Sequence, residues 1–343
     1  MGEITSKSQM EKIRNFEKGF FATHLINIGE KLGLFEVLLK AKDGMSVSDL
    51  AVELKLHEPY LKVWCQTAYF FEILGCDNLG RFRLQPFLDE ILGDKTHFKN
   101  YLANISLSVN YLGNFFEIYP ELFRSGMIGK DVYTQDFSKA AYEPTKNIYL
   151  VFLFMIFPKN DPLKQMLERG VKLLDIGCGN GNLTIQLAQA FKKSTFVGID
   201  PVPHGIEEAK SRIVKLGLEE RVSFRNLGAE DISSIDEFDL AVMAVTLHEI
   251  PPGIRGKVLE KAYHALKSSG QLLILDFPYP SKIEEFRNPM YDFGILDQFF
   301  EVCGGFTHLN MNEQNEMLDQ AGFKNIQRMN IGKGMFEFIT ATK

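Results

Sequence analysis

The chain has 343 residues, which is enough for two domains of ordinary size. Its 38 basic and 44 acidic residues leave a formal net charge of −6, which argues against nucleic acid as the main partner. Four well-separated cysteines show neither a disulfide framework nor metal-site spacing, so we expect reduced thiols and a cytoplasmic protein. Met1–Glu17 is polar, and the longest apolar run, Tyr149–Phe157, is far shorter than the about 20 residues that cross a bilayer. We therefore expect no signal peptide and no membrane contact.

The first part of the sequence predicts helices followed by a hairpin. Apolar residues recur at helical spacing in Phe16–Leu39, and Ser46–Leu54 and Glu58–Ile73 follow as further helices. Gly75–Leu84 then alternates apolar and polar residues around the turn residues Asn78–Gly80. This order of helices and hairpin is typical of a winged-helix domain.

A winged helix raises the question of DNA binding. The recognition helix would be Glu58–Ile73, which offers Lys62 and Gln66 but is otherwise crowded with aromatic side chains. Because a recognition helix needs several polar side chains to reach bases and phosphates, the pattern favours packing and dimerisation over DNA binding.

The next segment, Phe98–Phe157, is helical in pattern and holds fourteen Phe or Tyr residues in its sixty positions. Core packing is the ordinary explanation for such aromatic residues. The alternative, which stays open at this point, is a pocket for a flat or apolar ligand, lined in part by Tyr149 and Phe152.

The most informative segment is Leu173–Asn182, which reads L-L-D-I-G-C-G-N-G-N. It predicts a buried strand and then a turn at Gly177, Gly179 and Gly181 that excludes side chains, and Leu183–Phe191 predicts the helix that follows. Strand, glycine turn and helix together indicate a nucleotide-type site in an α/β sheet.

The spacing of these glycines and two acids narrow the choice of ligand. A dinucleotide fingerprint reads G-x-G-x-x-G, whereas this turn reads G-x-G-x-G. The carboxylate of Asp175 at the strand end does not help to bind a pyrophosphate, but it suits a cation such as S-adenosylmethionine (SAM). Asp200 ends the next strand-like run, twenty-five residues later, where a ribose diol would lie.

These motifs resemble those of the class I SAM-dependent methyltransferases. The resemblance rests on D-x-G-x-G-x-G at Asp175–Gly181, on Asp200, and on the runs Phe238–Ala244 and Gly270–Asp276. The N-terminal half is similar to small-molecule O-methyltransferases that carry a winged-helix-like dimerisation domain. The resemblance implies an all-α, winged-helix-like domain followed by a Rossmann-like α/β domain, with a mostly parallel sheet that ends in an antiparallel strand.

The resemblance also implies an organisation and a substrate class. It divides the chain into a dimerisation domain (1–97), connecting helices that contribute to the substrate pocket (98–161) and a SAM-binding catalytic domain (162–343). The enzyme would be a homodimer that methylates a small, hydroxylated, partly apolar metabolite and releases S-adenosylhomocysteine.

The cofactor contacts that the resemblance implies lie at the ends of successive strands. In many relatives the loop after the third strand begins with Gly-Asp, but Leu227 and Gly228 stand there in this chain, so Glu230 or Asp231 is expected to meet the adenine instead. The residues expected around SAM are Asp175, Gly177, Cys178, Gly179, Gly181, Asp200, Pro201, Ala229, Glu230, Asp231 and Ala244.

The candidate catalytic residue is His248, at the carboxyl end of the strand Phe238–Val245. In the resembled O-methyltransferases a histidine here deprotonates the substrate hydroxyl, as a neutral imidazole can do. Asp276 matches the first of two carboxylates that hold this histidine. The second is expected in Gly304–Leu309, where Thr307 and His308 stand instead as candidate substrate contacts.

Other readings stay open. His248 lines the site without acting as a base if carbon or nitrogen is methylated. An NAD-type oxidoreductase is disfavoured by the glycine spacing and Asp175, and a winged-helix regulator is disfavoured by the acidic charge. Direct methyl transfer needs no metal, and no acidic cluster predicts one.

Overall fold

The computed structural model describes residues 4–343 except 96, 98 and 129–134. The chain forms two compact units, which are described separately. The first comprises Met1–Glu121 with Asp131–Thr145, and the second comprises Leu122–Lys130 with Lys146–Lys343. Both units take residues from the segment 98–161, and the division into three parts stays a prediction.

The first unit begins with helices and a two-stranded hairpin, in the predicted order. Its elements are α1 (Ser6–Lys31), α2 (Leu34–Lys40), α3 (Val47–Leu54), α4 (Glu58–Phe70), β1 (Leu74–Cys76) and β2 (Phe82–Leu84). The predicted helical stretch Phe16–Leu39 is two helices, because Gly33 takes a left-handed φ of 72° between them. In the core of this unit, the Trp64 indole donates a hydrogen bond of 3.0 Å to the Leu25 carbonyl and so ties α4 to α1.

The described part of the aromatic-rich segment is mostly helical, as predicted. It contains α5 (Leu102–Leu107), α6 (Gly113–Ser125), α7 (Gln135–Thr145) and α8 (Ile148–Leu150), with π-helical turns at Ser108–Leu112 and Val151–Ile156. Two of its aromatic residues, Phe98 and Tyr133, lie outside the described residues.

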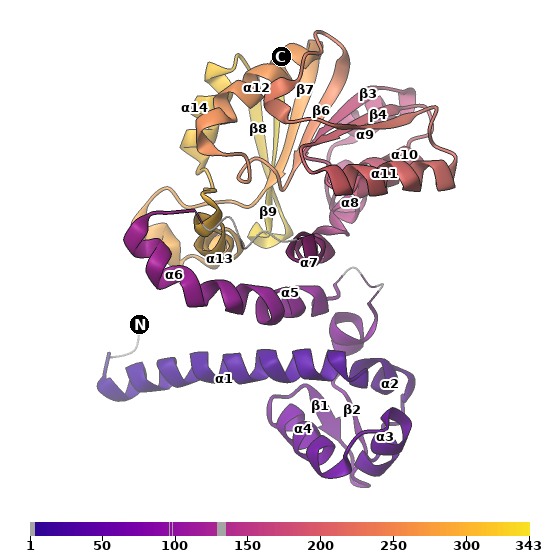
Figure 1. Ribbon diagram of the computed structural model, residues 1–343, viewed down its shortest axis with the longest axis vertical. Helices are drawn as coiled ribbons and strands as arrows, with labels where there is room; N and C mark the ends of the chain where they lie inside the picture. The colour runs from indigo at the N-terminus through magenta and orange to yellow at the C-terminus, as the bar shows by residue number, and fades with distance from the viewer. Residues whose placement is uncertain (1–3, 96, 98, 129–134) are drawn as a thin grey trace. The chain divides into compact units, whose positions relative to one another are not determined.

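The second unit is built on a seven-stranded sheet in the order β5-β4-β3-β6-β7-β9-β8 (Figure 1). Its strands are β3 (Lys172–Ile176), β4 (Thr195–Asp200), β5 (Val222–Asn226), β6 (Phe238–Ala244), β7 (Leu266–Asp276), β8 (Lys324–Ile331) and β9 (Phe336–Thr342). The first five strands in this order run parallel, whereas β9 is antiparallel to both of its neighbours. The predicted fold class is therefore confirmed. The strand order reverses at β3, and open α/β sheets bind ligands at such a point.

Helices cover both faces of this sheet (Figure 1). Side chains alternate along a strand, so Leu173 joins the core under α10 and α11, while Leu174 joins the core under α12 and α14. The helices are α9 (Asp161–Arg169), α10 (Asn182–Ala190), α11 (Pro203–Leu216), α12 (Arg255–Ala265), α13 (Asp292–Glu301) and α14 (Met311–Gln320). The helix α13 was not predicted from the sequence, and it contributes a carboxylate to the candidate site described below.

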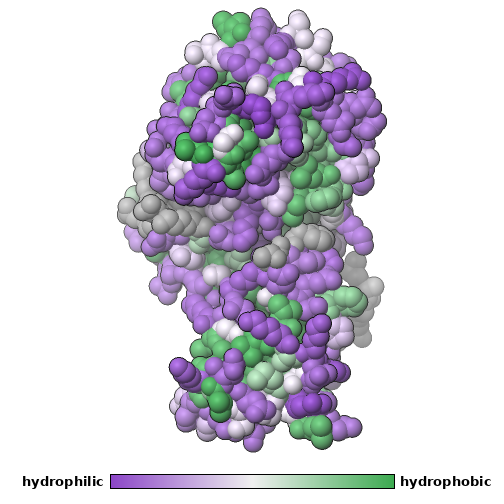
Figure 2. All heavy atoms as spheres, turned by 90° about the vertical axis from the view of Figure 1, so that its right-hand side faces the viewer, coloured by the Kyte–Doolittle hydropathy of each residue, from purple (hydrophilic) through white to green (hydrophobic). Residues whose placement is uncertain are grey.

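Hydrophobic groups on the face drawn in Figure 2 form separate patches in a mostly hydrophilic surface. Within the described ranges, no helix combines the length and the apolar character that a membrane span requires.

Candidate functional site

The glycine turn lies at the carboxyl end of β3, as predicted. Gly177 and Gly179 have φ values of 74° and 54°, a region that favours glycine. A Cβ on Gly177 would lie 2.3 Å from Cγ2 of Thr246, so this position is closed to any side chain. A Cβ on Gly179 would meet nothing within 4 Å. The backbone at Gly179 therefore faces open space, which fits a nucleoside that lies directly on the turn.

Two buried carboxylates support this turn from below. Asp200, at the end of β4, accepts hydrogen bonds from the backbone N–H groups of Gly179 (2.9 Å) and Val202 (2.8 Å). Asp175 accepts one from the Thr184 hydroxyl on α10, and burial raises the pKa of Asp175 to about 7. Each Asp200 oxygen keeps capacity for a further donor, such as a ribose hydroxyl. A direct contact between Asp175 and a ligand stays a prediction, because Asp175 is 2% exposed.

The remaining predicted cofactor residues gather at the same edge of the sheet. Cys178 is buried beneath the turn, where burial raises the pKa of its thiol, so it packs there rather than acting as a nucleophile. The Leu227 N–H donates to the Asp200 carbonyl (3.0 Å) and so brings the loop after β5 beside the end of β4. Pro201 follows Asp200, Ala244 ends β6, and Ala229, Glu230 and Asp231 form one short 3₁₀ turn.

His248 and Asp276 form a buried pair at the ends of neighbouring strands. The chain turns sharply after β6, where Val245 has a φ of 55° and donates a backbone hydrogen bond to Leu275 on β7. This turn brings Nδ1 of His248 to 2.6 Å from Oδ1 of Asp276, while the His248 N–H donates to the other oxygen (3.3 Å). A carboxylate can only accept, so Nδ1 carries the proton and Nε2 faces away from Asp276.

The electrostatic attraction between His248 and Asp276 is strong. Burial by itself disfavours an imidazolium, but the charge of Asp276 and its hydrogen bond outweigh burial and raise the pKa of His248 to about 10. In the same way, the interaction with His248 overcomes burial and lowers the pKa of Asp276 below its usual range. Both shifts favour the form in which an imidazolium faces a carboxylate.

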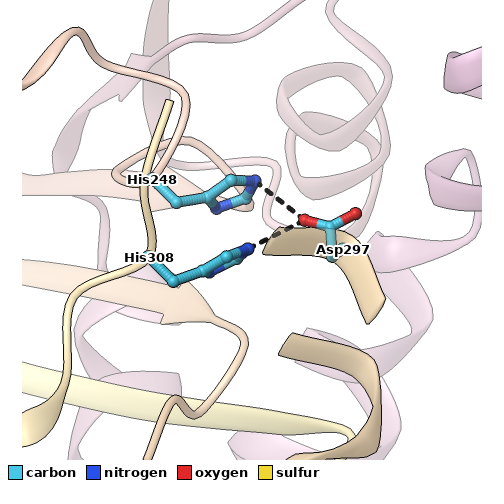
Figure 3. A group of neighbouring side chains, drawn as sticks. All are labelled: His248, Asp297 and His308. Atoms are coloured by element: carbon cyan, nitrogen blue, oxygen red, sulfur yellow. Dashed lines mark hydrogen bonds and ion pairs between the residues drawn. The ribbon is translucent and has the colours of Figure 1, made fainter. Parts of the chain in front are cut away.

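A second carboxylate faces His248, but it comes from α13. Oδ2 of Asp297 lies 3.6 Å from Nε2 of His248 and 2.9 Å from Nε2 of His308, and Figure 3 shows both rings directed at this one oxygen. The two imidazole rings stack, with centroids 4.3 Å apart and planes at 20°. The segment Gly304–Leu309 holds no acid, and the carboxylate that faces His248 stands instead eleven residues before His308, on a helix.

Sequence reasoning missed Asp297 because nothing in the local sequence ties it to His248. Asp297 and Glu301 stand four residues apart on α13 and so share one face of that helix, a weak signal that could have been noticed. Glu301 is 7% exposed, and burial, together with the charges of Glu249 and Asp297, raises the pKa of Glu301 to about 8. The surroundings of His248 are thus rich in acids.

Two predicted substrate contacts have partners within the protein. The Thr307 hydroxyl (3.1 Å) and carbonyl (2.6 Å) both accept hydrogen bonds from the buried Arg255 guanidinium. Phe152 is 1% exposed, and its ring packs against Phe157 and Phe338 in the core, so it offers no surface to a ligand. Tyr149 is half-buried against the same core.

His248, Asp297 and His308 are also residue types that bind zinc, and their ligand atoms lie within 4.8 Å of one another. A tetrahedral metal needs lone pairs that converge on one point. Here Nε2–H of His308 already donates to Asp297, and a metal ion between the three groups would have to displace this hydrogen bond. The arrangement fits shared protons better than a metal ion.

Comparisons with known proteins agree with this geometry. Residues 167–326 match the family model of a methyltransferase domain. An uncharacterized methyltransferase from Synechocystis is 29% identical over 185 residues, which are 52% of this chain and 80% of that protein.

Two solved structures are similar along nearly the whole chain. They are an O-methyltransferase family protein from Burkholderia thailandensis (15% identity, TM-score 0.76, 99% of both chains) and human N-acetylserotonin methyltransferase in complex with SAM (17% identity, TM-score 0.75, 100% of this chain and 99% of that one). At these identities they show the fold, including that of the helical N-terminal part.

The matched family model spans the glycine turn, Asp200, His248 and Asp276. The sheet order and the open backbone at Gly179 are those that a nucleoside cofactor needs. Residues 167–326 of this chain are therefore a methyltransferase domain with the class I fold, in which SAM is the expected methyl donor.

Proposed function

We propose that this enzyme methylates a hydroxyl oxygen of a small molecule, with His248 as the general base. The observation that carries the proposal is the 2.6 Å contact between Nδ1 of His248 and Asp276, which leaves Nε2 as the nitrogen that can take a proton. His248 follows the end of β6, beside the glycine turn, since Thr246 packs directly on Gly177.

In the proposed methyl transfer, different residues of the chain bind the cofactor and accept the proton. The bound cofactor supplies a methyl group on a sulfonium, which an oxygen attacks directly. The glycine turn and Asp200 hold the nucleoside. His248 receives the proton of the acceptor at Nε2, and Asp276 keeps the ring in the correct tautomer and stabilises the imidazolium that forms. Arg255, which donates to the backbone carbonyls of Ile250 and His248, fixes the turn that carries the base.

The high pKa of His248 sets a condition for this chemistry. An imidazolium cannot accept a proton, so base catalysis needs the neutral form. A cation bound nearby lowers the pKa of an imidazole, and SAM is a cation whereas S-adenosylhomocysteine is not. We therefore expect the pKa of His248 to be lower in the SAM complex than in the S-adenosylhomocysteine complex.

The descriptions of two similar solved structures support the proposal that the methyl acceptor is a hydroxyl oxygen. One is described as an O-methyltransferase family protein and another as an N-acetylserotonin methyltransferase. Methylation of carbon or nitrogen, with His248 only lining the site, remains the alternative, and a product analysis separates the two.

The decisive experiment uses methyl-labelled SAM with fractionated metabolites of the host, and the variant His248→Ala. We expect a labelled methyl ether from the wild type, and we expect turnover to fall by about 100-fold or more in the variant, with SAM affinity retained. His264→Ala is the matched control, because the His264 side chain is 55% exposed and stands on α12. Full turnover in His248→Ala would refute the base role, and a product labelled on nitrogen or carbon would refute the acceptor class.

The proposal includes a cytoplasmic homodimer formed through the first unit. Phe16 and Phe20, on α1, are 63% and 61% exposed, although apolar residues of this size are usually covered. Light scattering of the double variant Phe16→Ser/Phe20→Ser tests this. We expect a dimer for the wild type and a monomer for the variant, and a dimer of unchanged stability would exclude this surface.

A further inference from the structure

His248 has a charged neighbour at each end of its imidazole ring. Asp276 accepts from Nδ1, and Asp297 lies 3.6 Å from Nε2. A separation of 3.6 Å is too long for a hydrogen bond but short enough for a strong Coulomb interaction. The side of the ring that must receive the proton of the acceptor therefore faces a carboxylate.

Asp297 does not reach this position by chance, because His308 and its neighbours fix it. Nε2–H of His308 donates to Oδ2 of Asp297 (2.9 Å). The His308 ring is itself held between the rings of His248 and Tyr279, with centroids at 4.3 and 5.6 Å and planes at about 20°.

The backbone around His308 is tied to the same helix. Its N–H donates to Oε1 of Gln298 (2.6 Å), and Nε2 of Gln298 donates to the Phe306 carbonyl (3.2 Å). Two successive residues of α13, Asp297 and Gln298, are therefore linked to the loop that carries His308. The loop, the helix and the base form one connected unit.

We propose that Asp297 is a positioning carboxylate for His248, placed by the hydrogen bond from His308, and that it stabilises the positive charge that His248 gains when it takes a proton. His308 acts through Asp297 and not on the acceptor. Asp297 and His308 together thus supply the second carboxylate beside His248 that was expected from the segment Gly304–Leu309. The inference rests on the proposed role of His248 as the base, but its test does not need an acceptor.

Other charged groups also face His248, and the test must separate them from Asp297. They are Asp276 at the end of β7, Glu249 on the same turn, Glu301 on α13, His308 before α14, and Arg255 on α12, whose guanidinium contacts the His248 carbonyl. Only Asp297 accepts the hydrogen bond from the His308 ring among the described residues.

The experiment is a pH titration of the full-length protein, with ¹³C-labelled histidine followed by NMR. The seven histidines are assigned by single substitutions, and the pKa of His248 is measured in Asp297→Asn, in His308→Phe and in the double variant. The phenyl ring keeps the stack but removes the donor. We expect each single variant to lower the pKa of His248 by about one pH unit, and the double variant to lower it no further than Asp297→Asn alone.

Asp292→Asn is the matched control, because Asp292 is an exposed aspartate at the start of the same helix. The Asp297 side chain is 31% exposed and the substitution keeps its size, so we expect the variant to fold, and calorimetric SAM affinity verifies this. An unchanged His248 pKa in folded Asp297→Asn would overturn the proposal. A larger drop in the double variant than in Asp297→Asn would show that His308 acts directly, and would overturn its assigned role. Loss of turnover in His248→Ala, in contrast, concerns only the base.

Discussion

The substitution Asp276→Asn removes the charge that holds the protonated form of His248. The two side chains are 2% and 3% exposed and their closest atoms lie 2.6 Å apart. The pKa of His248 is raised from 6.5 to about 10, and this interval corresponds to about 5 kcal/mol at about 1.4 kcal/mol per pH unit. That energy stabilises the charged form in the folded state.

The sign of the pH effect follows from this shift. A histidine whose pKa is higher in the folded state stabilises the fold fully below its unfolded value of 6.5, and this contribution is lost as the pH rises to about 10. An asparagine carries no charge, so His248 loses the largest of the interactions that oppose the effect of burial, and its pKa drops. Between pH 6 and pH 10, the difference in free energy of unfolding between wild type and Asp276→Asn should therefore shrink by up to about 5 kcal/mol.

Urea unfolding at pH 6, 8 and 10, followed by fluorescence or circular dichroism, measures this difference. Asp239→Asn is a suitable control, because Asp239 is a partly exposed aspartate of the same sheet whose Oδ1 binds Lys267. If the stability difference between wild type and Asp276→Asn is the same at all three pH values, His248 does not carry the charge that we assign to it.

Two further predictions concern the frame of the site. Gly177→Ala would place a Cβ 2.3 Å from Thr246 at a left-handed φ, so we expect calorimetry to show that SAM affinity falls at least 10-fold. The control Gly253→Ala has open space around the new Cβ and should bind SAM normally. Equal affinities of the two variants would contradict the close packing of the turn. Arg255→Lys loses the planar guanidinium that donates hydrogen bonds to three backbone carbonyls, so we expect the free energy of unfolding to drop by about 3 kcal/mol or more. Urea unfolding measures this drop. A variant as stable as the wild type would show that these hydrogen bonds contribute little to stability.

The sheet and the cofactor half of the site could be predicted because their signals are local. An apolar run, three glycines and an aspartate two residues ahead of them specify a strand, a turn and a ligand type within ten residues. The strands Thr195–Ile199 and Phe238–Val245 were placed within one residue of β4 and β6 by the same kind of pattern. His248 and Asp276 followed because parallel neighbouring strands end at one edge.

The second half of the site could not be predicted, because packing brings its parts together. Asp297 meets His308 only when α13 folds against the loop at Phe306–His308, and no spacing rule links the two. Phe152 illustrates the same limit, since a buried aromatic ring in the core and one in a pocket have the same sequence pattern. Their roles depend on neighbours such as Phe338, which is 186 positions away.

The reversal of strand order at β3 has a consequence for how such enzymes diversify. Most of the groups expected to hold SAM lie at or after the ends of β3, β4 and β5, whereas the proposed base His248 and its partners Asp276, Asp297 and His308 lie at or after the ends of β6 and β7. The donor side and the acceptor side are thus encoded in successive stretches of the gene. Exchange of residues 277–310 between relatives would therefore change which molecule is methylated and would leave the methyl donor unchanged. A single contiguous replacement could in this way give the enzyme a new substrate.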